Sequence, residues 1–122
     1  MKRIELFERA IAEEAGSFEE WGINPTLFWA YRNSLTAGND QIDFSETIWD
    51  TDIEAITRTL KENGISEFTI SSTFSSLIPT LAEFAKHGFQ MAGLTEVRGN
   101  YTDWQTKERV IVPAIRMVAE EA

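Results

Sequence analysis

The chain contains no cysteine, which excludes a disulfide, a thiolate metal site and a cysteine nucleophile. It contains one histidine, His87, at the end of a predicted helix that starts in a serine-rich turn. About eleven residues at 1.5 Å each place His87 roughly 16 Å from that turn. A general base must lie within hydrogen-bond reach of its nucleophile. We therefore predict no catalytic residue, no enzyme and no cofactor.

Basic residues are also few, because 11 Lys and Arg stand against 20 Asp and Glu, giving a net charge of −9. Nucleic-acid binding needs cations that displace phosphate counterions, so we predict no direct contact with nucleic acid. No apolar run approaches membrane-spanning length, and the acid-rich residues 1–15 do not resemble a signal peptide. These absences predict a cytoplasmic protein without a membrane contact.

The length of 122 residues fits one globular domain, 1–122, with a helical part at 1–38 and an α/β part at 41–118. In the helical part, residues 2–15 have apolar residues at helical spacing. Ser17 begins a capping box that predicts a single helical turn. Asn24 followed by Pro25 predicts the start of a longer helix, with the neighbouring Trp29 in the core.

The α/β part alternates between strand and helix patterns. We predict strands at 41–48, 65–71, 89–97 and 109–118, with Gly93 marking a bulge in the third. A capping box at Thr51 predicts the start of the first intervening helix, and residues 76–87 form the second. Pro113 cannot donate to a ladder, so the last strand is expected at an edge. A helix starting at Pro113 is the competing interpretation.

This order predicts an α/β domain, with an α+β arrangement as the alternative. It has a mixed sheet of about four strands, a β-α-β-α-β-β core and two N-terminal helices packed on it. Two crossovers predict parallel pairing of the first three strands. The short turn before the last strand predicts antiparallel pairing with the third. We expect the N-terminal helices to cover the open face of the sheet.

One candidate site is the hydroxyl-rich turn after the second strand, where ligands of α/β sheets gather. Hydroxyls and backbone N–H groups at a helix start can hold an anion, and an arginine can add charge. Helix-start chemistry alone also explains serine in such a turn. The ligand-binding candidates are Ser71, Ser72, Thr73, Ser75, Ser76, Arg98 and Glu46. No calcium-loop pattern is present, and we predict no metal site.

The second candidate is the acid-rich segment 40–54. Six acids and no base fall between Asn33 and Thr57. Such a run is typical of a solvated face, and it also suits a protein partner with a basic surface. Trp49 and Trp104 are candidate surface anchors. The predicted partner surface consists of Asp40, Asp43, Trp49, Asp50 and Asp52.

The sequence therefore favours a noncatalytic protein-interaction module, as a monomer or a homodimer. The alternatives are a small-ligand domain at the Ser71–Ser76 turn and a nucleic-acid mimic that inhibits a DNA-binding protein. In size and composition the chain resembles small acidic proteins of unknown function carried by bacterial mobile elements. That resemblance implies no role for any particular residue.

Overall fold

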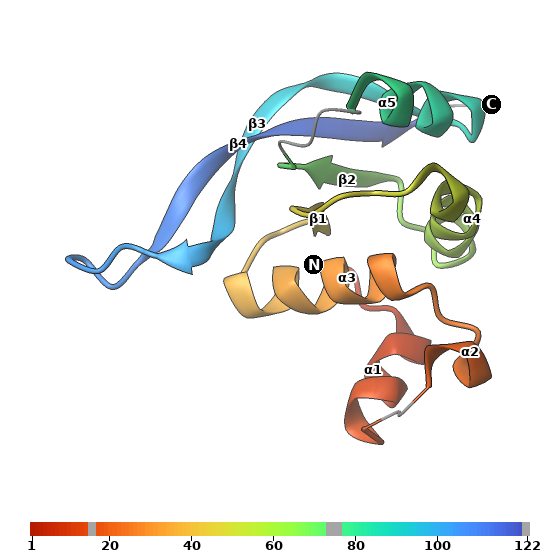
Figure 1. The fold of residues 1–122 in the computed structure, drawn as a ribbon, viewed down its shortest axis with the longest axis horizontal. Helices are drawn as coiled ribbons and strands as arrows, with labels where there is room; N and C mark the ends of the chain where they lie inside the picture. The colour runs from red at the N-terminus through yellow and green to blue at the C-terminus, as the bar shows by residue number, and fades with distance from the viewer. Residues whose placement is uncertain (15–16, 73–76, 121–122) are drawn as a thin grey trace.

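The computed structural model describes residues 1–14, 17–72 and 77–120, and it shows a mixed α/β domain. No helix within these ranges is long and apolar enough to cross a membrane. The elements, seen in Figure 1, are α1 (Glu5–Ala12), α2 (Phe18–Trp21), α3 (Pro25–Ala37), β1 (Asp43–Phe44), the 3-10 turn η1 (Asp50–Asp52), α4 (Ile53–Glu62), β2 (Glu67–Ile70), α5 (Leu77–Lys86), β3 (Phe89–Thr102) and β4 (Arg109–Ala119).

Two of the three predicted helix caps form. The Ser17 hydroxyl accepts from the Glu20 N–H at 3.4 Å, and the Asn24 side chain accepts from the Leu27 N–H at 3.0 Å. Each cap satisfies a backbone donor of the first turn. The prediction at Thr51 is wrong, because α4 follows η1 and has no side-chain cap.

The sheet has four strands in the order β1-β2-β4-β3. β1 and β2 pair in parallel, and β4 pairs antiparallel with both β2 and β3. The prediction that the first three strands pair in parallel is wrong for β3, because β4 lies between β2 and β3. The antiparallel pairing of the last two strands is confirmed, and so is the bulge, which shifts the register between Met91 and Gly93.

Two predicted strands differ from the structure in length or position. β1 spans only Asp43–Phe44 instead of 41–48. β4 is a strand through Pro113, so the competing helix is wrong, but β4 is central rather than at an edge. β2 pairs with β4 only as far as Ile115, while Pro113 pairs with Glu96 of β3. The proline therefore lies where β4 has a neighbour on one side only, which a strand tolerates.

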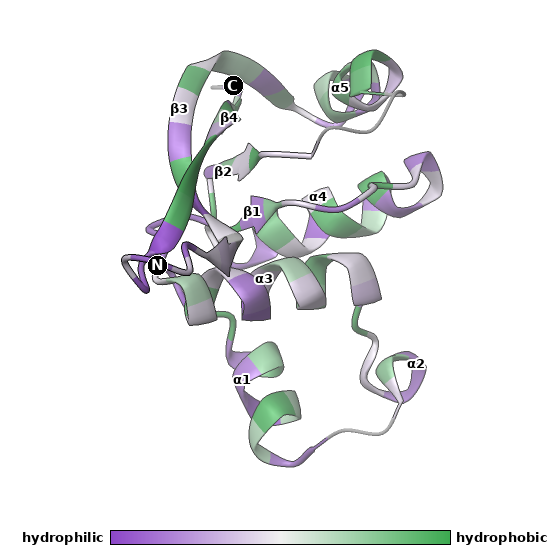
Figure 2. Ribbon diagram, turned by 60° about the vertical axis from the view of Figure 1, so that its left-hand side comes forward, coloured by the Kyte–Doolittle hydropathy of each residue, from purple (hydrophilic) through white to green (hydrophobic). Residues whose placement is uncertain are grey.

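The helices are distributed unequally over the two faces of the sheet. α4 and α5 lie against one face, while α3 runs along β1 and carries α1 and α2 on its far side (Figure 1 and Figure 2). The N-terminal helices therefore lie at the β1 side and leave the other sheet face open, contrary to the prediction. Trp29 of α3 is 46% exposed, so its assignment to the core is also wrong.

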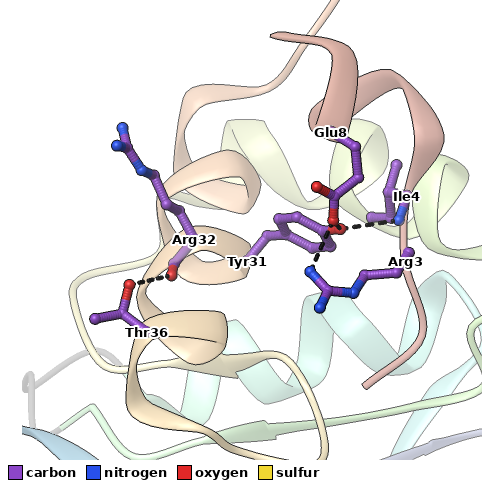
Figure 3. Close-up of polar contacts among 6 residues, drawn as sticks. All are labelled: Arg3, Ile4, Glu8, Tyr31, Arg32 and Thr36. Carbon is purple, nitrogen blue, oxygen red and sulfur yellow. Dashed lines mark hydrogen bonds and ion pairs between the residues drawn. The ribbon is translucent and has the colours of Figure 1, made fainter. Parts of the chain in front are cut away.

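A polar network attaches α1 to α3 (Figure 3). The buried Tyr31 hydroxyl donates to the Glu8 carboxylate at 2.5 Å and accepts from the Ile4 N–H at 3.2 Å. Arg3 pairs with the same carboxylate at 2.9 Å. The Tyr31 hydrogen bond, aided by Arg3, holds the pKa of Glu8 below its ordinary value of 4.5, and burial raises the pKa of Tyr31.

We expect Tyr31→Phe to lower the free energy of unfolding by about 1–2 kcal/mol, because a buried hydroxyl with two partners is lost. The low pKa of Glu8 in the folded state stabilises the protein above the unfolded-state pKa. This stabilisation disappears as the pH falls through the folded-state pKa. The variant should therefore lose less stability than the wild type on acidification, as measured by urea unfolding across the acid range.

Tyr101→Phe is the matched control, because Tyr101 is exposed on β3. It should leave both the stability and its pH dependence unchanged. An equal effect of the two substitutions would contradict the role given to the network.

Candidate functional site

The serine-rich turn uses its described hydroxyls inside the fold. Ser71 donates to the Asp43 carboxylate at 2.6 Å, and Ser72 donates to the backbone oxygens of Phe44, at 3.2 Å, and Glu46. The backbone N–H groups of Ser71 and Ser72 also donate to the Phe44 oxygen. These bonds fix the stretch that follows β1. The other predicted ligand residues of this turn, Thr73, Ser75 and Ser76, lie outside the described residues.

Asp43 does not belong to a partner surface, because its side chain is buried and the residue is 5% exposed. Its carboxylate accepts from the Thr69 and Ser71 hydroxyls, each at 2.6 Å, and its N–H donates to the Ser34 hydroxyl at 2.8 Å. A buried carboxylate needs such donors to offset desolvation. Asp43 therefore ties β1 to β2 and α3, and its placement on the acidic face is corrected.

Arg98 is fixed at the end of α3. The Asn39 side chain accepts from the Arg98 N–H at 2.8 Å and donates to the Arg98 carbonyl at 3.0 Å. The Arg98 guanidinium donates to the Gly38 carbonyl at 2.9 Å. We call this contact the Asn39–Arg98 clamp. The clamp ties the α3–β1 loop to β3. The Arg98 guanidinium is therefore not directed to the serine-rich turn.

The clamp borders a cavity of about 580 Å³, which we call the sheet pocket. Its charged lining residues are Asp40, Glu67, Glu96, Arg98 and Arg116. Arg116 already pairs with Glu67, and Arg98 is bound in the clamp. The remaining charges are acidic, so this pocket does not provide the anion site that Arg98 was predicted to complete.

A second cavity, of about 190 Å³, lies between α3 and the stretch after β1. We call it the tryptophan groove. Trp29 forms part of one wall, and Trp49, which is 65% exposed, forms part of the other. Glu46 also lines it, and no lining residue that the structure describes is cationic. The complete lining is Pro25, Thr26, Trp29, Ala30, Asn33, Phe44, Ser45, Glu46, Thr47 and Trp49.

The other predicted partner residues differ in their availability. Asp40 and Asp50 are exposed. Asp52 is partly buried, and its carboxylate accepts from the side chains of Asn24, at 3.2 Å, and Thr26, at 3.0 Å. Asp52 therefore connects η1 to the start of α3, where Thr26 also lines the groove.

The juxtaposition of Trp29 with Trp49 was not predicted, because the two residues are far apart in the sequence. The Trp29 ring packs against Phe18 and Phe28, with centroids at 6.0 and 5.5 Å, and Arg32 lies over it at 5.8 Å. Trp104 is 77% exposed at the turn between β3 and β4. Trp49 and Trp104 are both exposed, and their role as surface anchors stays a prediction.

The structure is thus a mixed α/β domain with a tryptophan-lined groove, containing one acid, beside β1. Residues 26–119 match the model of a domain of unknown function (DUF7698). Because this match covers more than half of the chain, the protein belongs to that family. The comparisons with curated proteins and with solved structures gave no match.

The position of Asp43 predicts that Thr69→Val destabilises the protein. The change removes one of two hydroxyls bonded to a buried carboxylate, which should cost about 1–3 kcal/mol of unfolding free energy. Thermal or urea unfolding would measure it. Thr95→Val, at the partly exposed wall of the sheet pocket, is the matched control and should be near neutral. Equal losses would show that hydroxyl removal, rather than the Asp43 network, causes the effect.

Proposed function

We propose that this protein is a noncatalytic protein-binding module whose tryptophan groove takes a basic segment of a partner protein. The observation that carries the proposal is the pair of partly exposed tryptophans, Trp29 and Trp49, on opposite walls of one groove with Glu46 beside them. Tryptophan is enriched at interaction hot spots, and its ring face attracts lysine and arginine.

The size of the groove supports a side chain as the occupant. Sites for small molecules usually enclose about 300–1,000 Å³, whereas this groove encloses about 190 Å³. A single lysine or arginine side chain with an apolar neighbour suits a space of that scale. It would place its charge near Glu46 and its methylene groups against indole.

Charge around the groove supports a basic partner. Of the acids in segment 40–54, Asp40, Glu46, Asp50 and Glu54 are exposed, and no base interrupts that segment. Acidic surfaces of this kind steer basic partners during encounter. The Arg32 guanidinium already lies over the Trp29 ring. The more exposed Trp49 ring is therefore more accessible to a cation of the partner.

The two alternative functions have less support. A ligand site at the Ser71–Ser76 turn would have to use residues other than Ser71 and Ser72, whose hydroxyls bond within the fold. A nucleic-acid mimic needs an exposed row of carboxylates in place of phosphates. Asp43 is buried and Asp52 is bonded to α3, so two acids are missing from such a row.

We expect peptides that contain lysine or arginine beside an apolar residue to bind the wild-type protein in isothermal titration calorimetry. Trp49→Ala should weaken that binding about 30-fold, the equivalent of a hot-spot loss of about 2 kcal/mol. Circular dichroism would check the fold, which should survive because Trp49 is mostly exposed. Absence of binding by every basic peptide would contradict the proposal.

Glu46→Lys tests the charge of the groove separately. We expect it to weaken the same peptide about tenfold or more, because a like charge replaces an attractive one at the site. Glu62→Lys is the control, since it makes the same charge reversal at an exposed position on α4. Equal weakening by both variants would mean that net charge, and not the groove, governs binding.

A further inference from the structure

The outer part of the β3–β4 hairpin projects from the domain as an arm (Figure 1). We define the arm as residues 99–109, beyond the Asn39–Arg98 clamp. β2 reaches β4 only at Ile115, so the two strands of the hairpin continue outward without a third. From Tyr101 to Glu108, every residue of the arm except Asp103 is exposed.

The turn of the arm is stabilised by hydrogen bonds within the arm. The Asp103 N–H donates to the Glu108 carbonyl at 2.8 Å, and the Lys107 N–H donates to the Asp103 carbonyl at 2.9 Å. The Asp103 carboxylate accepts from the N–H groups of Gln105 and Thr106 at 2.7 and 3.1 Å. A segment that is ordered before it binds loses little conformational entropy on docking.

This ordered tip exposes aromatic side chains. Trp104 is 77% exposed on the turn, and Tyr101 is 61% exposed near the end of β3; the hydrogen bonds given above for the turn use neither side chain. Lys107 is exposed in the same connection between β3 and β4, and Arg109 donates to the Gly99 carbonyl at 3.0 Å. The tip thus exposes an indole and one lysine, Lys107, although Glu108 beside that lysine is exposed as well and the arm as a whole carries no net charge.

The tryptophan groove has the complementary chemistry, with two indoles, an acid and no cationic lining residue among those described. The arm extends away from α3, the helix that forms one wall of the groove in the same molecule (Figure 1). It leaves the domain beyond the C-terminal end of α3 (Figure 1), whereas the groove follows α3 from its first residue, Pro25, to Asn33.

We infer that the arm of one molecule docks into the tryptophan groove of a second copy, with Trp104 between the groove walls and Lys107 near Glu46. The inference rests on the proposed function, since it names the partner segment that the groove takes. The net charge of −9 opposes association at long range. Screening confines that repulsion to about 8 Å at physiological ionic strength, so the contact itself decides the outcome.

Sedimentation velocity over a range of protein concentrations, at physiological ionic strength, tests this contact. We expect reversible self-association of the wild type. Trp104→Ser and Trp49→Ala should each weaken it at least about 30-fold, as expected for a hot-spot residue. Leu94→Ser is the control for nonspecific hydrophobic association. Leu94 is exposed on β3 outside the arm, so its substitution should leave the self-association constant unchanged.

A mixture of the two variants gives the sharper result. The Trp49→Ala protein keeps an intact arm, and the Trp104→Ser protein keeps an intact groove. Neither should associate alone, yet together they should form a one-to-one pair through a single arm–groove contact. Glu46→Lys in the groove partner should abolish the pair, and Lys107→Glu in the arm partner should weaken it.

The outcomes separate this inference from the proposed function. A wild type that stays monomeric overturns the inference, while binding of basic peptides to the groove would leave the proposed function intact. Self-association that survives Trp104→Ser but not Leu94→Ser also overturns it and assigns the contact to the edge of β3. If the two variants pair with each other but no basic peptide binds, the arm–groove contact is upheld. The proposal that the groove takes a basic segment of another protein is then contradicted.

Discussion

Burial of Phe68 is the interaction on which the rest of the structure depends. Its ring contacts Phe44 of β1, Phe84 of α5 and Phe89 of β3, with centroids 5.4, 5.0 and 5.2 Å away. Such aromatic pairs add about 0.5–1.5 kcal/mol each beyond the burial of their area. One side chain of β2 thereby fixes two other strands and the covering helix. Phe44 also lines the tryptophan groove, so this aromatic cluster fixes the position of the groove wall that contains Phe44.

The features that sequence predicts well are those whose physics is local. Ser17 and Asn24 cap helices by accepting from an N–H three residues away. All the residues that form each cap therefore lie together in the sequence, where a local pattern can reveal them. Asp52 has the same capping chemistry, but its carboxylate bonds to Asn24 and Thr26 on another helix. No pattern around Thr51 contains those partners. The placement of β4 between β2 and β3 likewise depends on pairings that no stretch of the chain encodes alone.

The candidate site shows the same division. Exposure of Trp49 and Trp104 follows from their polar surroundings in the sequence, whereas the meeting of Trp29 with Trp49 depends on how α3 lies along β1. The acid run suggests one continuous surface. Alternation in β1 instead turns Asp43 away from Phe44, and the hydroxyls of Thr69 and Ser71 then enclose it. Such enclosure is visible only when β1 and β2 are side by side.

The central position of β4 has a consequence for the order of events during synthesis. β2 and β3 do not pair with each other and are joined only through β4, so the sheet remains divided until residues 109–119 have been made and have paired. Until then β2 has an open side, and nascent chains with unpaired strand edges are prone to misassociation. Closure of the sheet is therefore expected to be a late step of folding, because it waits for β4 to pair on both sides.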